Sequence, residues 1–211
     1  LMDKIIVTSN HSKDTLINTS YQIVNKETQA FAGTASVKTP VEVVGYPVKL
    51  TEKKSVKLNL ETDFNFLMVS QWGPRKNTVY TGLPVVTTNW SGQSDFLNMP
   101  VKQIKKGSKK KTVTTIKSMI GSVEFTLGPV QKEAVWDGVL QADSMWCYAD
   151  QTSYQNILGD VFDDYNKYKE MAKKLKAHVK KEFEAEKQYD AFANAVYPAQ
   201  EVNEPEVVSF D

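Results

Sequence analysis

The apolar positions of the first two thirds of the chain fall into short runs separated by polar segments. Four of these runs predict strands: residues 4–8 (KIIVT), 41–48 (VEVVGYPV), 64–70 (FNFLMVS) and 83–89 (LPVVTTN). Ser9 or Ser12 would cap a helix over residues 13–24, and a short helix should end near Leu97. This alternation predicts an α/β fold.

The region that follows is less regular. Residues 122–127 (SVEFTL) predict one more strand, and Ala134, Val135, Val139 and Leu140 give residues 130–141 a helical spacing. Residues 145–149 (MWCYA) are apolar but too short to assign. The tryptophans Trp90, Trp136 and Trp146 are expected to serve as packing residues.

The C-terminal third has a helical pattern from about residue 153 to 197, with a break expected near residues 159–164. One helical face carries five apolar residues at spacings of three and four: Tyr168, Met171, Leu175, Val179 and Phe183. Lys and Glu mix on the opposite face, which favours a helix packed on its own domain over one lying on a membrane. Residues 198–211 form an acidic tail that we expect to be mobile.

Residues 66–77 (FLMVSQWGPRKN) join an apolar run to a turn that carries two cations. Large apolar residues with hardly a charge are typical of a strand buried on both faces, as in a parallel sheet flanked by helices. Because open α/β sheets bind ligands at the carboxyl ends of their strands, Arg75 and Lys76 predict an anionic ligand there. A basic pair taken alone would more simply be two solvated cations at the start of a helix.

Composition limits the range of functions. The chain has 211 residues, is 41% hydrophobic and has a formal net charge of +1, so it can bury a core and is not expected to coat nucleic acid. Cys147 is the only cysteine, which favours a reducing, intracellular setting. No apolar run is long enough for a membrane helix or a signal peptide, so we expect a soluble, cytoplasmic protein.

Metal and nucleotide-phosphate motifs are missing from the sequence. His11 and His178 do not form a metal-ligand pattern with Cys147, and we expect both on the surface, although His11 could contact a substrate. No Gly-rich loop of the Walker or dinucleotide type is present, which disfavours a kinase or a dehydrogenase.

Residues 101–117 (VKQIKKGSKKKTVTTIK) form a lysine-rich segment, predicted to be a solvated, flexible loop. Its alternative role is weak contact with an anionic surface or polymer. The lysines concerned are Lys102, Lys105, Lys106, Lys109, Lys110 and Lys111.

Five segments, taken in order, resemble the carboxyl-terminal half of a GT-B glycosyltransferase of the retaining, glycogen-synthase-like group. DKIIVTSNHSKDTL resembles the last strand and helix of the amino-terminal domain, and TPVEVVGYPV resembles the interdomain strand. FLMVSQWGPRKN and YTGLPVVTTNWSGQSDFL resemble the phosphate loop and a later strand of the donor domain. The segment from WCYADQTSYQ to the end of KKEF resembles the terminal helices. Together they cover about two thirds of the chain.

The resemblance implies a Rossmann-like parallel sheet of GT-B type, incomplete here, and transfer of a sugar from a nucleotide diphosphate-sugar with retention and without a metal. By the same resemblance Arg75 and Lys76 contact the donor diphosphate and Gly73 shapes the loop, whereas Ser91 and Gly92 form a possible donor-contact turn. The acceptor, whether glycan, lipid-linked or protein, is not specified. The implied divisions are residues 1–48, the end of the acceptor domain; 49–197, the donor domain with its helices; and 198–211, the tail.

The sequence departs from the family pattern after Asn77. The paired Glu residues that hold the sugar and ribose are absent, and only a few residues separate the two donor-domain motifs. We therefore expect the parent protein to be longer, with an insertion after Asn77. A non-catalytic remnant of the fold and a polyanion-binding protein remain as alternatives.

Overall fold

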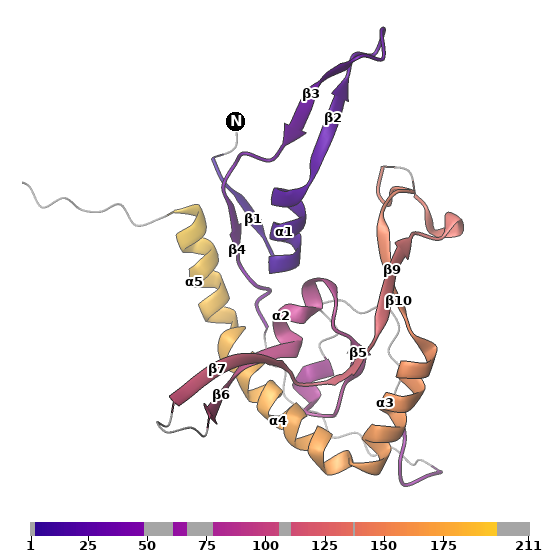
Figure 1. The fold of residues 1–211 in the computed structure, drawn as a ribbon. Helices are drawn as coiled ribbons and strands as arrows, with labels where there is room; N and C mark the ends of the chain where they lie inside the picture. Colours follow the sequence, from indigo (N-terminus) through magenta and orange to yellow (C-terminus); the bar gives the residue numbers. More distant parts are fainter. Residues whose placement is uncertain (1–2, 49–60, 67–77, 106–110, 137, 198–211) are drawn as a thin grey trace, which may run out of the picture.

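The computed structural model describes residues 3–48, 61–66, 78–105, 111–136 and 138–197 (Figure 1). Within these residues the fold is mixed α/β, and the strands form only two-stranded pairs. Two pairs are parallel and three are antiparallel. Of the incomplete Rossmann-like parallel sheet expected from the sequence, the described part contains two separate parallel pairs, and the expected C-terminal helices are present.

The N-terminal part begins with β1 (Ile5–Val7), which pairs in parallel with β4 (Val41–Val43). Helix α1 (Asn10–Asn18) follows β1 and is capped by Ser9, whose Oγ accepts a hydrogen bond from the backbone N–H of Ser12 at 3.1 Å. Of the two candidate caps, Ser9 is thus the one used.

The helix expected over residues 13–24 is wrong in its second half. Residues Ser20–Val24 form β2, which pairs with β3 (Phe31–Ser36) in an antiparallel hairpin. The reason lies in the turn: Asn25 Oδ1 accepts hydrogen bonds from the backbone N–H groups of Glu27 and Thr28, at 2.8 and 3.1 Å. This Asx turn reverses the chain, and the β-branched and aromatic residues before it then favour a strand.

The middle of the chain contains the second parallel pair, β5 (Val86–Thr88) with β8 (Gly121–Val123). Short helical segments surround β5. They are the 3-10 helices η2 (Thr78–Thr81) and η3 (Ser91–Gln93), and helix α2 (Ser94–Leu97), which ends where the sequence predicted.

Two antiparallel ribbons complete this part. The first is β6 (Asn98–Lys105) with β7 (Lys111–Ser118), so most of the lysine-rich segment is strand rather than loop. The second is β9 (Phe125–Pro129) with β10 (Met145–Ala149), which means that the single strand expected over residues 122–127 is divided between β8 and β9.

The helix expected over residues 130–141 is wrong. Among the described residues of this range the only helical element is the 3-10 helix η4 (Lys132–Ala134). A tight turn follows it, in which the backbone N–H of Leu140 donates to the carbonyl of Trp136 at 2.7 Å. Gly138 closes this turn with a φ of 76°, a left-handed conformation that interrupts any helix. Trp136 is 69% exposed and Trp146 37%, so the expectation that they serve as packing residues is also wrong.

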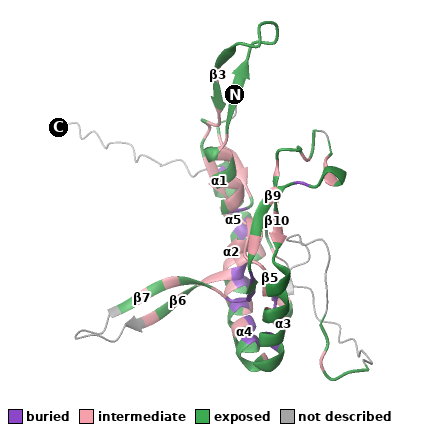
Figure 2. Cartoon of the chain, turned by 45° about the vertical axis from the view of Figure 1, so that its right-hand side comes forward, coloured by how far each residue is buried: buried purple, intermediate pink, exposed green. Residues whose placement is uncertain are grey.

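Three helices end the described chain: α3 (Gln151–Asp163), α4 (Tyr165–Glu182) and α5 (Ala185–Val196). The predicted break falls at Asp164, which ends α3 and caps α4 by accepting a hydrogen bond from the backbone N–H of Lys167 at 3.3 Å. The predicted apolar face of α4 is confirmed, because Tyr168, Leu175 and Val179 are buried. Figure 2 shows this buried stripe along α4.

The main hydrophobic cluster lies where α4 meets η2, α2 and the base of the β6–β7 ribbon. Its buried members are Val79, Val85, Leu97, Met119, Ile120, Leu175 and Val179. The β2–β3, β6–β7 and β9–β10 ribbons project away from this cluster and are largely exposed (Figures 1 and 2).

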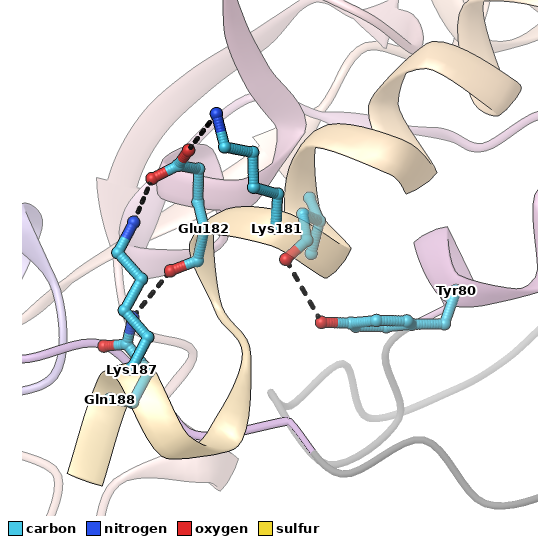
Figure 3. Close-up of polar contacts among 6 residues, drawn as sticks. Tyr80, Lys181, Glu182, Lys187 and Gln188 are labelled. Atoms are coloured by element: carbon cyan, nitrogen blue, oxygen red, sulfur yellow. Dashed lines mark hydrogen bonds and ion pairs between the residues drawn. The ribbon is translucent and has the colours of Figure 1, made fainter. Parts of the chain in front are cut away.

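The corner between α4 and α5 contacts the segment that follows β4 near the start of the chain. The backbone N–H of Val48 donates to the carbonyl of Phe183 at 3.0 Å, and a Cβ on Gly45 would lie only 2.9 Å from Gln188 Oε1. Gln188 in turn donates to the carbonyl of Glu182 at 2.7 Å (Figure 3). The segment that follows β4 therefore lies directly against this corner.

Residues 64–66 lie outside any strand. Phe64 packs edge-on against Phe66, Phe162 and Tyr165, with ring centroids 5.1–5.4 Å apart, and Phe66 is 55% exposed. The buried strand expected over residues 64–70 is therefore wrong at its start, while residues 67–70 and the tail at 198–211 lie outside the described residues.

Among the described helices none is long and apolar enough to cross a membrane.

Candidate functional site

The turns that follow the two parallel strand pairs meet each other. β1 leads into Ser9 and the start of α1, and β5 leads through Asn89 and Trp90 into η3. Both turns thus stand at the carboxyl ends of parallel strands, where α/β folds position ligand-binding groups. We call this junction the two-turn site and define it by Ser9, His11, Trp90, Ser91 and Gly92.

The closest approach across the junction is between Gly92 and Ser9. A Cβ built on Gly92 would lie 3.0 Å from Ser9 Oγ and 3.1 Å from Ser9 Cβ. Ser9 is buried, and its Oγ is held by the backbone N–H of Ser12 at 3.1 Å and by the Ser12 hydroxyl at 2.9 Å. A side chain at residue 92 would therefore require Ser9 to give way by a few tenths of an ångström, so glycine suits this position best.

Two further contacts hold the turns together. The His11 imidazole lies edge-on to Trp90, with ring centroids 5.4 Å apart. The backbone N–H of Asn10 donates to Asp95 Oδ2 at 2.8 Å, so a carboxylate on α2 satisfies an N–H group at the start of α1. The start of α1 is consequently bound to protein groups through both Asn10 and Ser12.

The turn after β5 is fixed by its own hydrogen bonds. Ser91 has a φ of 65°, a conformation that is uncommon outside glycine, and its carbonyl accepts a hydrogen bond from Ser94 Oγ at 2.8 Å. Gln93 Nε2 donates to the carbonyl of Thr88 at 2.7 Å. Asn89 and Asn98 exchange amide hydrogen bonds at 3.0 and 3.1 Å. The backbone at Ser91 and Gly92 is thus held in one conformation.

The side chains at the two-turn site suit a hydroxylated ligand better than a metal ion. His11, Ser12 and Ser91 are only half-buried and offer hydroxyl and imidazole groups that both donate and accept hydrogen bonds. Within the described residues no group of three or more His, Cys, Asp or Glu side chains could hold a metal ion. The Asp95 carboxylate already accepts the hydrogen bond from the backbone N–H of Asn10.

The residues predicted from the sequence are divided between this site and the undescribed part of the chain. Ser91 and Gly92 lie at the two-turn site. Gly73, Arg75 and Lys76 lie outside the described residues. Sequence reasoning gave Ser9 only a capping role and did not single out Asp95, because nothing local to either residue indicates a partner so distant along the chain.

The groups with shifted pKa values, which are Tyr80, Glu170 and Glu182, all lie outside the two-turn site. Burial raises the pKa of Tyr80 to about 12, and its hydroxyl lies 3.5 Å from the carbonyl of Val179 near the end of α4. The hydrogen bond from Lys187 lowers the pKa of Glu182 (Figure 3). Burial and a neighbouring lysine therefore explain the shifted pKa values of Tyr80 and Glu182 without a catalytic role.

Comparison with known proteins adds no further assignment. No protein-family model matches the chain, and neither a curated protein nor a solved structure is significantly similar to it. Any functional conclusion therefore rests on the residues themselves.

Proposed function

We propose that this chain belongs to a glycosyltransferase that moves a sugar from a nucleotide diphosphate-sugar donor to an acceptor hydroxyl. The bond between the anomeric carbon and the diphosphate breaks, and a bond to the acceptor oxygen forms on the same face of the sugar. The proposal rests on the resemblance of five segments to the GT-B group and, structurally, on the two-turn site.

The contact between Ser9 and Gly92 is the observation that supports the proposal most. Ser9 belongs to the segment resembling the end of the acceptor domain, and Gly92 to the segment resembling the donor domain. In a GT-B enzyme those segments come from the two sides of the domain cleft. The contact brings residues of both segments together, and a donor bound there would lie beside His11 and the backbone of Ser91.

Arg75 and Lys76 are assigned to the diphosphate by resemblance alone. A guanidinium offers a planar set of donors to phosphate oxygens, and an ammonium adds a compact positive charge. Both would stabilise the negative charge that grows on the diphosphate as the sugar leaves, which is how electrostatic catalysis lowers a barrier. This role needs no metal ion.

The test is calorimetric binding of UDP, GDP, ADP and their sugar conjugates to the full chain, with Arg75→Ala as the variant. The expected result is a measurable Kd for one nucleotide that weakens at least tenfold in Arg75→Ala, roughly the contribution of one charge-assisted contact. Lys180→Ala is the matched control, because it removes one exposed cation from the last turn of α4 and should leave the Kd unchanged.

Two outcomes would oppose the proposal. Absence of affinity for every nucleotide diphosphate would favour the non-catalytic remnant. Binding that survives Arg75→Ala but falls steeply with salt would show that the nucleotide is held only as a polyanion.

A further inference from the structure

The β9–β10 ribbon carries large apolar side chains that the fold leaves exposed. Trp136, in the turn beyond the ribbon, is 69% exposed, and Trp146 on β10 is 37% exposed. Neither indole makes a ring contact among the described residues. Exposed apolar residues that gather in one segment mark a binding site more often than scattered ones do. The others in this segment are Leu127, Val139 and Met145.

Two aromatic residues share one face of the ribbon. Trp146 and Tyr148 are two residues apart on β10, so their side chains leave the same face about 7 Å apart. The residue directly opposite Trp146 is Gly128, which has no side chain to cover the indole. We call this surface the aromatic platform and define it by Trp146, Tyr148 and Gly128.

The Tyr148 ring is held in place before any ligand arrives. Its hydroxyl donates a hydrogen bond to the carbonyl of Pro129 at 2.6 Å. A Cβ built on Gly128 would lie 3.1 and 3.3 Å from ring atoms Cε2 and Cδ2 of Tyr148, so the ring lies against the Gly128 backbone. Because the ring is already ordered, less conformational entropy is lost when a ligand packs on it.

The ribbon rises from the edge of the fold that carries the two-turn site. β5 and β8 end side by side, because Thr88 is opposite Val123 in their parallel pair. From there β5 leads into the two-turn site, and β8 leads through Glu124 into β9. Gly128 lies four residues beyond Glu124, about 14 Å along an extended strand. Figures 1 and 2 show the ribbon extending toward the end of the molecule where the N-terminal part lies.

Charge selects the class of ligand. Residues 122–136 and 138–150 contain four acidic residues and one lysine. This negative charge repels phosphates and acidic headgroups, so it disfavours nucleic acid and anionic lipid. A neutral sugar is not repelled, and its hydroxyl groups can donate hydrogen bonds to carboxylates. The C–H groups on a face of a sugar ring carry a slight positive charge, which suits the negative face of an aromatic ring.

We propose that the aromatic platform binds a neutral glycan, with sugar rings packed on Trp146 and Tyr148. The proposal rests on the transferase function proposed above and adds to it the class of acceptor. That acceptor is an oligosaccharide, held on the ribbon at one part of its length, whose end extends to the two-turn site. The ribbon then positions the acceptor and takes no part in the chemistry.

The experiment is affinity electrophoresis of the full chain through native gels that contain dissolved glycogen, dextran, mannan or galactomannan. We expect at least one of these neutral polysaccharides to retard the chain. Added salt should change the retardation little, because salt screens only charged contacts. Trp146→Ala should weaken binding roughly fivefold or more, since it removes an aromatic packing surface. Trp146→Phe should restore most of the loss.

Leu127→Ala is the matched control on the same ribbon. Leu127 is 49% exposed and pairs with Cys147, so it lies on the face opposite to the aromatic platform. Phe31→Ala removes an exposed aromatic ring from another ribbon, on β3. Neither change should alter the retardation, and circular dichroism would establish that each variant folds. If Trp146→Ala does not fold, the parent decides: bound polysaccharide should protect Trp146 from oxidation by N-bromosuccinimide.

Three results would overturn the proposal. They are no retardation by any of the four polysaccharides, equal losses in Trp146→Ala and Leu127→Ala, and binding to phosphatidylcholine vesicles that Trp146→Ala abolishes. The last would assign the platform to a lipid surface.

Failure of the transferase function would look different. Glycan binding by a chain with no affinity for any nucleotide diphosphate would keep the platform as a glycan site and would oppose only its role in holding an acceptor. Conversely, nucleotide binding that Arg75→Ala weakens, without any glycan binding, would support the transferase and overturn the platform.

Discussion

At the scale of single residues, Gly92 is the tightest point of the two-turn site. We expect Gly92→Ala to destabilise the protein by about 1 kcal/mol, because the new Cβ would press on Ser9, whose hydroxyl is fixed as the cap of α1. Urea denaturation gives the free energy of unfolding. The control is Gly159→Ala within α3, where nothing lies within 4 Å and the change should instead stabilise by about 0.5–1 kcal/mol.

The same pair allows a more specific test. Ser9→Gly removes both atoms that a Cβ on Gly92 would meet, and glycine as an N-cap costs only a few tenths of a kcal/mol. Gly92→Ala should therefore be better tolerated when combined with Ser9→Gly than alone. Strictly additive effects would mean that the two residues do not meet.

Tyr80 predicts how stability changes in alkali. Because burial raises the pKa of Tyr80 to about 12 in the folded protein, folding favours its neutral form, and that contribution is complete below the unfolded value near 10. It is lost as the pH rises from about 10 through about 12. In a series of melting temperatures, the parent should lose more than Tyr80→Phe over this interval.

Tyr189→Phe is the control for that series, since Tyr189 is 59% exposed on α5. Its melting profile should follow that of the parent. Parallel alkaline profiles for the parent and Tyr80→Phe would mean that the pKa of Tyr80 is the same in the folded and unfolded states, which would contradict the prediction. Near pH 7 the substitution should be almost silent, because the hydrogen bond lost is long, at 3.5 Å.

Residue roles were predictable from the sequence only where their cause is local. Ser9 as a cap follows from the residues next to it, as does the position of Asp164 between two helices. The contacts of Gly92 with Ser9 and of Asp95 with Asn10 join positions far apart in the chain. No local propensity encodes such pairings, so they emerge only from the tertiary fold.

At the scale of elements, the corner between α4 and α5 is held by Glu182, which pairs with Lys187 at 2.5 Å and with Lys181 at 3.9 Å (Figure 3). The pKa of Glu182 is lowered, chiefly by the hydrogen bond from Lys187. Its contribution to stability is therefore present above the ordinary carboxyl pKa and is lost as the pH falls through the lower, folded value.

A double-mutant cycle with Glu182→Gln and Lys187→Gln measures this contribution. We expect a coupling free energy of about 0.5 kcal/mol at neutral pH, because the pair is partly exposed and screened by solvent. The coupling should vanish in acid, where Glu182 is protonated. A coupling that persisted at low pH would mean that Glu182 and Lys187 interact through a hydrogen bond that does not depend on the carboxylate charge.

Elements with a strong period were predicted well, and those that depend on a distant partner were not. The face of α4 follows from apolar residues every three or four positions. Residues 13–24 and 130–141 have only a weak helical spacing, and an Asx turn at Asn25 and the left-handed Gly138 redirect the chain there. Such turns outweigh weak helical periodicity because they fix where strands can pair.

At the scale of the whole molecule, stability should be concentrated around α4. Leu175 is 1% exposed at the centre of the main cluster, whereas every residue of β2 is exposed and the β2–β3 hairpin pairs with no third strand among the described residues. An isolated two-stranded hairpin is marginally stable in water. The burial of Leu175 could be predicted from the periodicity of α4. The β2–β3 hairpin could not, because the sequence predicted a helix over residues 13–24, which include β2.

Hydrogen exchange tests this distribution directly. Amides of α4 near Leu175 and Val179 should exchange last, through global unfolding, while those of β2 and β3 should exchange early, through local opening. Leu175→Ala should speed exchange throughout the cluster, since emptying a buried leucine site costs about 2–5 kcal/mol, and should leave the hairpin rates unchanged. Slow exchange in β2 and β3 that becomes fast on dilution would contradict local opening, and would mean instead that exposed Tyr21 and Phe31 are covered by a second copy of the chain.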